Sequence, residues 1–264
     1  MIELDEIDRI IRKDLLKVLN TNIVYHYSNF EIGVEKIILN NNLKFSSPNE
    51  FNDPFDCNED LLKLRITKES AIKQIKDSKQ KLTRNERTRL IKKITNPNTI
   101  SSQMKETKKD YKLACFSEKS DETLMWSHYS DKHRGICIGF SFPHQYPGKF
   151  ILCPIKYLEK IEKLDGESEA TKVILYWLTT KSERWSYEKE IRAITQSKNT
   201  NSYGLIEFER KYVSEIIFGC MVPENDINQT MKKINLNYGE NNIIFNKMRI
   251  NSDTFLLEKI TISA

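Results

Sequence analysis

Short apolar runs separated by polar turns recur along most of the chain. Runs rich in β-branched and aromatic residues are typical of strands. Strands are therefore predicted at residues 22–27, 43–46, 113–117, 135–140, 150–157, 188–195, 213–218, 243–250 and 255–262. Apolar residues at three- and four-residue spacing predict helices over 30–40, 121–130 and 170–180. Because strands outnumber helices and the two do not alternate regularly, the predicted fold class is α+β.

The segment 63–112 differs from the rest of the chain in charge and in periodicity. It holds 16 lysines and arginines against 5 acids, a balance of +11, whereas the remainder of the chain carries −6. Its apolar residues recur at helical spacing, with a break at Asn96-Pro97-Asn98. We expect a single domain over 1–264, with a core at about 22–60 and 112–262 and a basic helical insertion at about 63–112.

Basic helices of this kind can hold nucleic acid through phosphate contacts or meet an acidic protein. A lysine-rich face that is merely solvated explains the pattern as well. The segment has one aromatic residue, Tyr111, near its end. Stacking on the bases of a single strand therefore has little support. A nucleic-acid or protein acceptor and a neutralising partner protein stay open as ligands of these helices.

A chain of 264 residues with 39% hydrophobic content can bury a sizeable core. No apolar run approaches the roughly 20 residues that cross a bilayer. The acidic start, residues 1–6, lacks the basic-then-apolar plan of a secretory signal. The five cysteines form no C-x-x-C pair, which favours reduced thiols over disulfides or a metal site. We expect a cytoplasmic protein that does not contact a membrane.

Two glutamates, Glu188 and Glu190, lie two positions apart in a segment that otherwise predicts a strand. Side chains at that spacing point to one face of a sheet. Adjacent like charges repel and burial disfavours their ionisation, so such a pair is costly unless the face lines a cleft. An exposed strand, with both acids solvated beside Lys189 and Arg192, is the equally weighted alternative.

Other polar residues gather at the ends of predicted elements. His26 lies within the first strand, where a hydrogen-bonded core histidine is the common alternative to a catalyst. Asn52, Asp53 and Asp56 fall in a proline-fixed turn that follows the second strand. Asn and Asp bond their own backbone in such turns, so a purely structural role fits this segment equally well.

Trp126, His128 and Tyr129 lie where a helix gives way to a strand. Together they offer stacking surfaces and hydrogen-bonding groups that suit a flat ring ligand. A helix that buries Trp126 and leaves His128 on the surface is an equal alternative. Neither G-x-G-x-x-G nor G-x-x-x-x-G-K occurs among the eight glycines. Kinase and dehydrogenase functions therefore lack their usual phosphate-binding loops.

Several short motifs follow one another in a fixed order. They are Tyr25-His26-Tyr27-Ser28, Phe45-Ser46-Ser47-Pro48, Phe51-Asn52-Asp53-Pro54-Phe55-Asp56, Cys115-Phe116-Ser117, Met125-Trp126-Ser127-His128-Tyr129, Gly135-Ile136-Cys137-Ile138-Gly139-Phe140 and the stretch from Trp185 to Arg192. In this ordered set the chain resembles a bacterial family of domains of unknown function, over roughly 23–222. Each motif is short, so the resemblance lies in the set.

The order of elements is also similar, more distantly, to the ADP-ribosyltransferase fold. That resemblance implies a split mixed or antiparallel sheet with flanking helices, and NAD as substrate. By order, His26, Ser117 and Glu190 take the places of NAD-binding, supporting and catalytic residues. Glu188 takes the place of a glutamate that activates or positions the acceptor. The same motifs would supply further NAD contacts, namely Tyr27, Ser46, Asn52, Asp53, Trp126, His128 and Tyr129.

The implied activity is that of an NAD-dependent ADP-ribosyltransferase or NAD glycohydrolase acting on an unidentified macromolecule, as a bacterial toxin or phage-defence effector. Cleavage of NAD passes through an oxocarbenium-like ribose, which a carboxylate stabilises. Two alternatives stay open. In a metal-dependent nuclease, Asp53, Asp56, Glu188 and Glu190 would gather Mg²⁺. In a non-catalytic module, the same cleft would only recognise a nucleotide or a partner.

Overall fold

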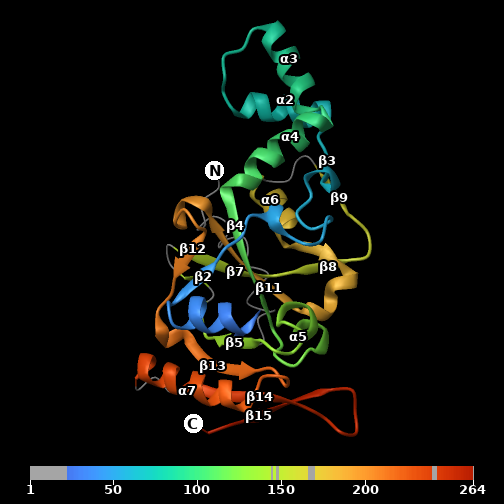
Figure 1. Cartoon of the computed structure of the whole chain (residues 1–264). Helices are drawn as coiled ribbons and strands as arrows, with labels where there is room; N and C mark the ends of the chain where they lie inside the picture. The colour runs from blue at the N-terminus through green and yellow to red at the C-terminus, as the bar shows by residue number, and fades with distance from the viewer. Residues whose placement is uncertain (1–22, 144, 147–148, 166–169, 240–242, 264) are drawn as a thin grey trace.

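The computed structural model describes residues 23–143, 145–146, 149–165, 170–239 and 243–263. A nine-stranded sheet forms its centre (Figure 1). Its strands are β1 (Val24–Ser28), β4 (Tyr111–Ser117), β5 (Ile136–Phe140), β6 (Gln145–Tyr146), β7 (Phe150–Pro154), β11 (Glu190–Gln196), β13 (Val213–Phe218), β14 (Ile244–Ile250) and β15 (Leu257–Thr261). In space they follow the order β15-β14-β13-β5-β1-β4-β11-β7-β6.

The sheet is mixed. Neighbouring strands run antiparallel except β13 and β14, which are parallel. Strands β5 and β11 are buried along their whole length, so other elements cover both of their faces. With helices packed on a large mixed sheet, the α+β prediction is confirmed.

The sheet is split between β1 and β4. These two strands share a single pair in register, Tyr25 with Ser117. In contrast, β1 pairs with β5 over five positions and β4 with β11 over seven. Beyond Tyr25 the two strands part, and the backbone groups that would have paired across the gap need other partners.

Helices cover both faces of the sheet. On one face lie the π-helical segment η1 (Ile32–Ile38) and α7 (Glu224–Tyr238), which bury Val34 and Ile234 against the main core. On the other face lie α5 (Thr123–Tyr129), α6 (Ala170–Thr179) and α4 (Pro97–Thr107). Successive residues of β11 alternate between these faces: Ile191 packs in the first core and Ile194 in the second.

Shorter elements connect these layers. Small two-stranded sheets pair β2 (Asn42–Lys44) with β12 (Leu205–Glu207), β8 (Lys156–Leu158) with β10 (Thr180–Ser182), and β3 (Lys63–Arg65) with β9 (Lys163–Asp165). Single turns of 3₁₀ helix complete the chain: η2 (Pro48–Glu50), η3 (Glu59–Leu61), η4 (Lys108–Asp110), η6 (Ser197–Asn199) and η7 (Arg210–Tyr212), with the longer η5 (Glu183–Glu188).

The basic segment forms α2 (Lys68–Asp77), α3 (Arg84–Ile94) and α4. Sequence signals fix their starts, because Thr67 caps α2 and Thr83 forms a capping box with Glu86 at α3. Figure 1 shows α2 and α3 projecting beyond the rest of the molecule, while α4 leads back toward the sheet. Only α4 of the three reaches the second core, through Ile100 and Met104.

Helix α7 was not predicted from the sequence, although Ile227, Met231 and Ile234 follow a helical spacing and are buried. The acidic start of the chain, on which the prediction about a secretory signal rests, lies outside the described residues. Among the helices of the described ranges, none is long and apolar enough to cross a membrane.

The core predicts a large difference between two identical substitutions. Phe140 is fully buried in β5 and stacks on Phe142, whereas Phe255 is fully exposed. Phe140→Ala should lower the free energy of unfolding by about 3–5 kcal/mol, and Phe255→Ala by less than about 0.5 kcal/mol. Urea denaturation of both variants measures this; equal losses would contradict the described core.

Candidate active site

A cavity of about 260 Å³ lies at the split in the sheet. It is lined by Tyr25 of β1, at the one pair that joins the two strands, and by residues 26–27 of β1 and 115–116 of β4, where the strands have separated. Its remaining walls come from the turn after η2, from α5, and from the ends of β10, η5 and β11. The separation of β1 from β4 therefore opens the cavity within the sheet.

Register places three side chains in one row across the sheet. Ser117 pairs with Tyr25 on one side and with Glu190 on the other. Residues directly opposite each other point to the same face of the sheet, and successive residues of a strand point to opposite faces. His26 follows Tyr25 in β1, so its side chain points to the other face than this row. His26 is half-buried at the cavity, and its Nδ1 lies 2.9 Å from the carbonyl oxygen of Cys115. Because a carbonyl oxygen only accepts hydrogen bonds, Nδ1 carries the proton. This bond supplies the carbonyl of Cys115 with a partner at a position where β1 and β4 are no longer paired.

Burial lowers the pKa of His26, and the bond to Cys115 offsets only part of that effect. The ring is therefore neutral at pH 7 and offers the cavity an uncharged imidazole.

The two glutamates reach the cavity from different elements. Strand β11 begins at Glu190, whereas Glu188 ends η5, and Lys189 between them adopts a left-handed conformation with φ of 44°. The predicted strand from residue 188 was thus wrong at its start, because Ser182 caps a helical turn there. The carboxylates still converge: the Nζ of Lys181 lies 2.6 Å from Glu188 and 3.1 Å from Glu190.

Glu190 is held as an ionised carboxylate. Nε of Arg192 donates to its Oε1 at 2.9 Å, and Nη2 of Arg192 donates to its Oε2 at 3.1 Å. Burial by itself would raise the pKa of Glu190, but Arg192 and Lys181 outweigh burial and lower the pKa to about 2. The carboxylate therefore keeps its charge at any physiological pH.

Glu188 has the opposite tendency. Burial raises the pKa of Glu188 above its ordinary value, and Lys181 beside it offsets only part of that rise. The hydroxyl of Tyr129 donates to its Oε1 at 2.7 Å. Two carboxylates whose pKa values are pushed apart by their surroundings are suited to different roles in acid–base chemistry.

Arg192 does not line the cavity, but it fixes the position of Glu190, which does. It is fully buried and donates two hydrogen bonds to Asp56, at 3.1 and 2.8 Å, and one to the carbonyl of Leu178 at 2.7 Å. A planar guanidinium held in this way has a single orientation. Asp56, from the proline-fixed turn, is thus a positioning residue for the catalytic candidate.

Lys181 was not anticipated from the sequence. It lies on β10, is buried, and forms ion pairs with Glu188 and Glu190. A longer ion pair joins its Nζ to Oδ2 of Asp56 at 3.8 Å. Burial lowers the pKa of Lys181, but the carboxylates outweigh burial and raise the pKa above its usual range. Three carboxylates therefore face two cations, Lys181 and Arg192, and the cluster carries a net charge of −1. We call this cluster the floor of the cavity, and its net negative charge favours positive charge in the cavity.

The structure divides the predicted binding residues into two groups. His26, Tyr27, Asn52 and Tyr129 line the cavity, together with both glutamates. Five predicted residues do not line it: Ser46, Asp53, Ser117, Trp126 and His128. Tyr25, Phe51 and Met125 line the cavity without having been singled out as NAD contacts.

The predicted ring-stacking role does not suit Trp126. Its side chain is fully buried, packs edge-on against Tyr27, and donates from Nε1 to the carbonyl of Ser120 at 2.8 Å. His128 is exposed and contacts the ring of Tyr129 from outside the cavity. The alternative that Trp126 is a core residue therefore fits the structure, and Tyr129 is the member of this motif at the site.

The other three residues support the site from its surroundings. Ser117 is fully buried, and its hydroxyl donates to the backbone carbonyl of Glu188 at 2.6 Å, which ties β4 to η5. The backbone of Ser46 pairs with Leu113, which ties the segment just before η2 to β4. Asp53 accepts from the amide of Phe55 at 2.9 Å in a turn, and its Oδ2 is buried without a described partner.

The acids near the cavity are paired with basic side chains. Over the described ranges, no group of three or more His, Cys, Asp or Glu residues is placed to hold a metal ion. Lys181 and Arg192 already occupy oxygens of Asp56, Glu188 and Glu190. The cluster of four acids that a nuclease would need is incomplete, because Asp53 lies outside the cavity lining.

Fold and site together define an α+β protein with a split sheet and an ion-paired carboxylate pair at its cavity. A profile of a family described as "Protein of unknown function (DUF2971)" matches residues 125–193. The matched stretch runs from α5 into β11 and includes Tyr129, Lys181, Glu188 and Glu190. No curated protein and no solved structure matches the chain. The ADP-ribosyltransferase resemblance therefore stays a prediction.

The depressed pKa of Glu190 predicts a pH-dependent contribution to stability. A carboxyl group with a lower pKa in the folded state stabilises the protein above its unfolded pKa of about 4.5, and this gain is lost as the pH falls toward about 2. The stability difference between the parent and Glu190→Gln should therefore shrink by on the order of 3 kcal/mol over this range.

Urea denaturation at a series of pH values measures this difference. Glu159→Gln is the matched control, because Glu159 is exposed and its replacement should give a small difference that varies little with pH. A parent–Glu190→Gln difference that stays constant down to pH 2 would show that Arg192 and Lys181 do not stabilise the ionised carboxylate.

Proposed function

We propose that the protein cleaves the bond between nicotinamide and ribose in NAD and transfers the ADP-ribosyl group to an acceptor or to water. The observation that carries this proposal is the pair of carboxylates with opposed pKa shifts, Glu188 and Glu190, at the floor of an aromatic-lined cavity. The split of the sheet at β1 and β4 agrees with the architecture that the ADP-ribosyltransferase resemblance implies.

The cavity suits the nicotinamide–ribose half of NAD. Its walls carry the rings of Tyr25, Tyr27, Phe51, Phe116 and Tyr129, which offer faces and edges to a flat pyridinium ring. A volume of about 260 Å³ is below the roughly 300–1,000 Å³ of sites for drug-sized ligands. The adenosine half would therefore extend outside the cavity. The net charge of −1 on the floor favours the cationic nicotinamide.

Bond cleavage follows from this charge distribution. When the bond from ribose C1′ to the pyridinium nitrogen breaks, its electron pair neutralises the nitrogen and positive charge passes to the ribose. Glu190, fixed as an anion by Arg192, interacts more strongly with the oxocarbenium-like state than with the ground state. No reorganisation is needed at that moment, because both partners are already in place.

The acceptor step is assigned to Glu188. Its raised pKa makes it a better base than an ordinary carboxylate near neutral pH. The acceptor hydroxyl, amine or water forms the new bond to C1′ while its proton passes to Glu188. Lys181 contacts both glutamates and so couples the two steps electrostatically.

The two other functions have less support. A nuclease would need a metal centre, and the acids near the cavity are instead ion-paired with Lys181 and Arg192. A non-catalytic nucleotide-binding module would gain nothing from two carboxylates with opposed pKa values. Cleavage of nucleic acid that needs no NAD and is lost on chelation of metal would favour the nuclease. Binding of NAD without turnover would favour the non-catalytic module.

Glu190→Gln should lower the rate of nicotinamide release from NAD by about 10²–10³-fold, because the amide cannot stabilise the ribosyl cation. Glu188→Gln should mainly lower the rate of transfer or hydrolysis. Chromatographic measurement of nicotinamide, with calorimetry of NAD binding, separates turnover from affinity. Glu159→Gln, an exposed change of the same kind, should keep the parent rate. Equal nicotinamide release by the parent and Glu190→Gln would contradict the assignment.

Tyr129→Phe predicts a shift in the pH profile. The tyrosine hydroxyl lowers the pKa of Glu188, so its removal should raise that pKa further. Because the ionised form acts as the base, the pH at which the rate rises should move to a higher value than in the parent. Tyr203→Phe, at an exposed ring, is the control and should leave the profile unchanged. If the pH–rate profile of Tyr129→Phe matched that of the parent, Glu188 would not be the base.

A further inference from the structure

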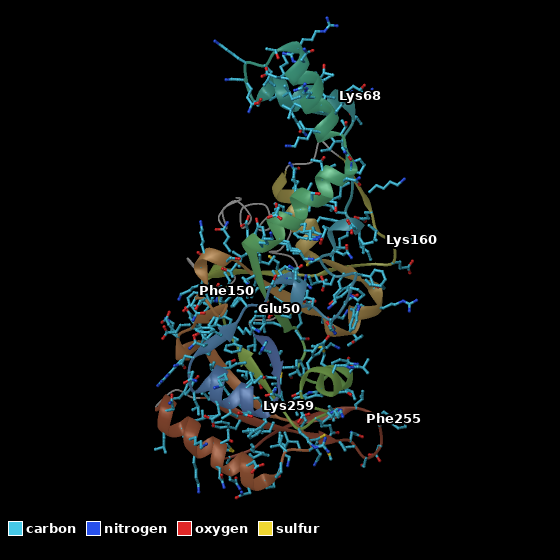
Figure 2. The ribbon with its side chains drawn as sticks, turned by 45° about the horizontal axis from the view of Figure 1, so that its top comes forward. Glu50, Lys68, Phe150, Lys160, Phe255 and Lys259 are labelled. Atoms are coloured by element: carbon cyan, nitrogen blue, oxygen red, sulfur yellow. The ribbon has the colours of Figure 1, made fainter. Side chains whose placement is uncertain are left out.

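The helices α2 and α3 form a basic projection, which we call the arm and define as residues 68–94. The arm contains ten lysines and arginines and three acids, a net charge of +7 in a chain whose total is +5. All ten cationic side chains are exposed: Lys68, Lys73, Lys76, Lys79, Lys81, Arg84, Arg87, Arg89, Lys92 and Lys93. Figure 1 shows the arm extending away from the sheet. Figure 2 shows the side chains of this region pointing outward, with Lys68 labelled.

Some exposed lysines elsewhere in the molecule pair with an acid, as Lys156 does with Glu162 and Lys233 with Glu35. Within the part of the chain that the structure describes, none of the ten arm cations forms a salt bridge. The arm is therefore an uncompensated concentration of positive charge, which repels itself and attracts polyanions.

We propose that the arm binds double-stranded nucleic acid through the phosphate backbone. Arg89, Lys92 and Lys93 are three or four positions apart on α3, so they share one face and can meet successive phosphates. Residues 68–94 contain no aromatic side chain, so the arm cannot stack on unpaired bases as single-strand binders do. The recognised chemistry is the regular phosphate array that DNA and RNA duplexes share.

The arm is poorly suited to the other polyanionic partners. A protein interface is usually built round apolar and aromatic anchors, but Ile72 is the one large apolar residue of the arm that is largely exposed. A membrane-surface helix would carry a stripe of large apolar or aromatic residues opposite its charges. On α3, Leu90, Ile91 and Ile94 are instead half-buried.

The test is binding of a labelled duplex of about 20 base pairs, DNA or RNA, followed by fluorescence anisotropy from about 50 to about 200 mM salt. The full chain is compared with an arm variant, Arg89→Gln with Lys92→Gln and Lys93→Gln. A body variant, Lys132→Gln with Lys160→Gln and Lys232→Gln, removes the same charge from exposed positions off the arm.

The arm variant should bind about 10- to 100-fold more weakly, with a salt dependence that is shallower by about two to three units, because up to three phosphate contacts are lost. The body variant should bind nearly as the parent does. A preference for DNA or for RNA would identify the form of duplex. Equal weakening of both variants, or no binding by the parent at the lowest salt, would overturn the proposal.

This inference goes beyond the proposed NAD chemistry and can fail independently of it. Glu190→Gln leaves the arm unchanged, so it should bind the duplex with the parent affinity. The arm variant leaves the cavity unchanged, so it should release nicotinamide from NAD at the parent rate when no nucleic acid is present.

Discussion

The buried guanidinium of Arg192 connects the parts of the chain that build the cavity floor. It contacts Asp56 from the turn after η2, Glu190 at the start of β11, and the carbonyl of Leu178 in α6. An isolated buried charge costs several kcal/mol, so each of these partners depends on the others. Hydrophobic residues of similar size would often be as stable in such a place. What the ion pairs provide here is one fixed geometry for a carboxylate at the cavity.

The split in the sheet places that fixed carboxylate in the lining of a cavity. A continuous ladder between β1 and β4 would leave no space at the middle of the sheet, and Glu190 would then be a buried charge without a use. Where the strands part, side chains replace the missing backbone partners, as His26 does for the carbonyl of Cys115. The cavity is therefore polar along its edges and aromatic on its walls, a combination typical of sites for flat ligands with polar substituents.

The sequence predicted this site in part, and the reasons differ from residue to residue. Strand existence, the basic helices and the glutamate pair follow from local patterns, and all are present. Trp126 was ambiguous, because the same helical position serves either a core or a ligand. Lys181 and the contact between Asp56 and Arg192 could not be predicted, since the latter joins residues 136 positions apart and leaves no local signal.

Helix α7 could have been found from Pro223 and the acids Glu224 and Asp226 that begin it.

Charge is distributed unevenly between the arm and the cavity. The arm carries +7, while the cluster of Asp56, Lys181, Glu188, Glu190 and Arg192 carries −1. One chain therefore carries both an exposed group of uncompensated cations and a buried ion-paired cluster with a net negative charge. The modest total of +5 conceals this division, because it sums a concentrated positive surface with a nearly neutral remainder.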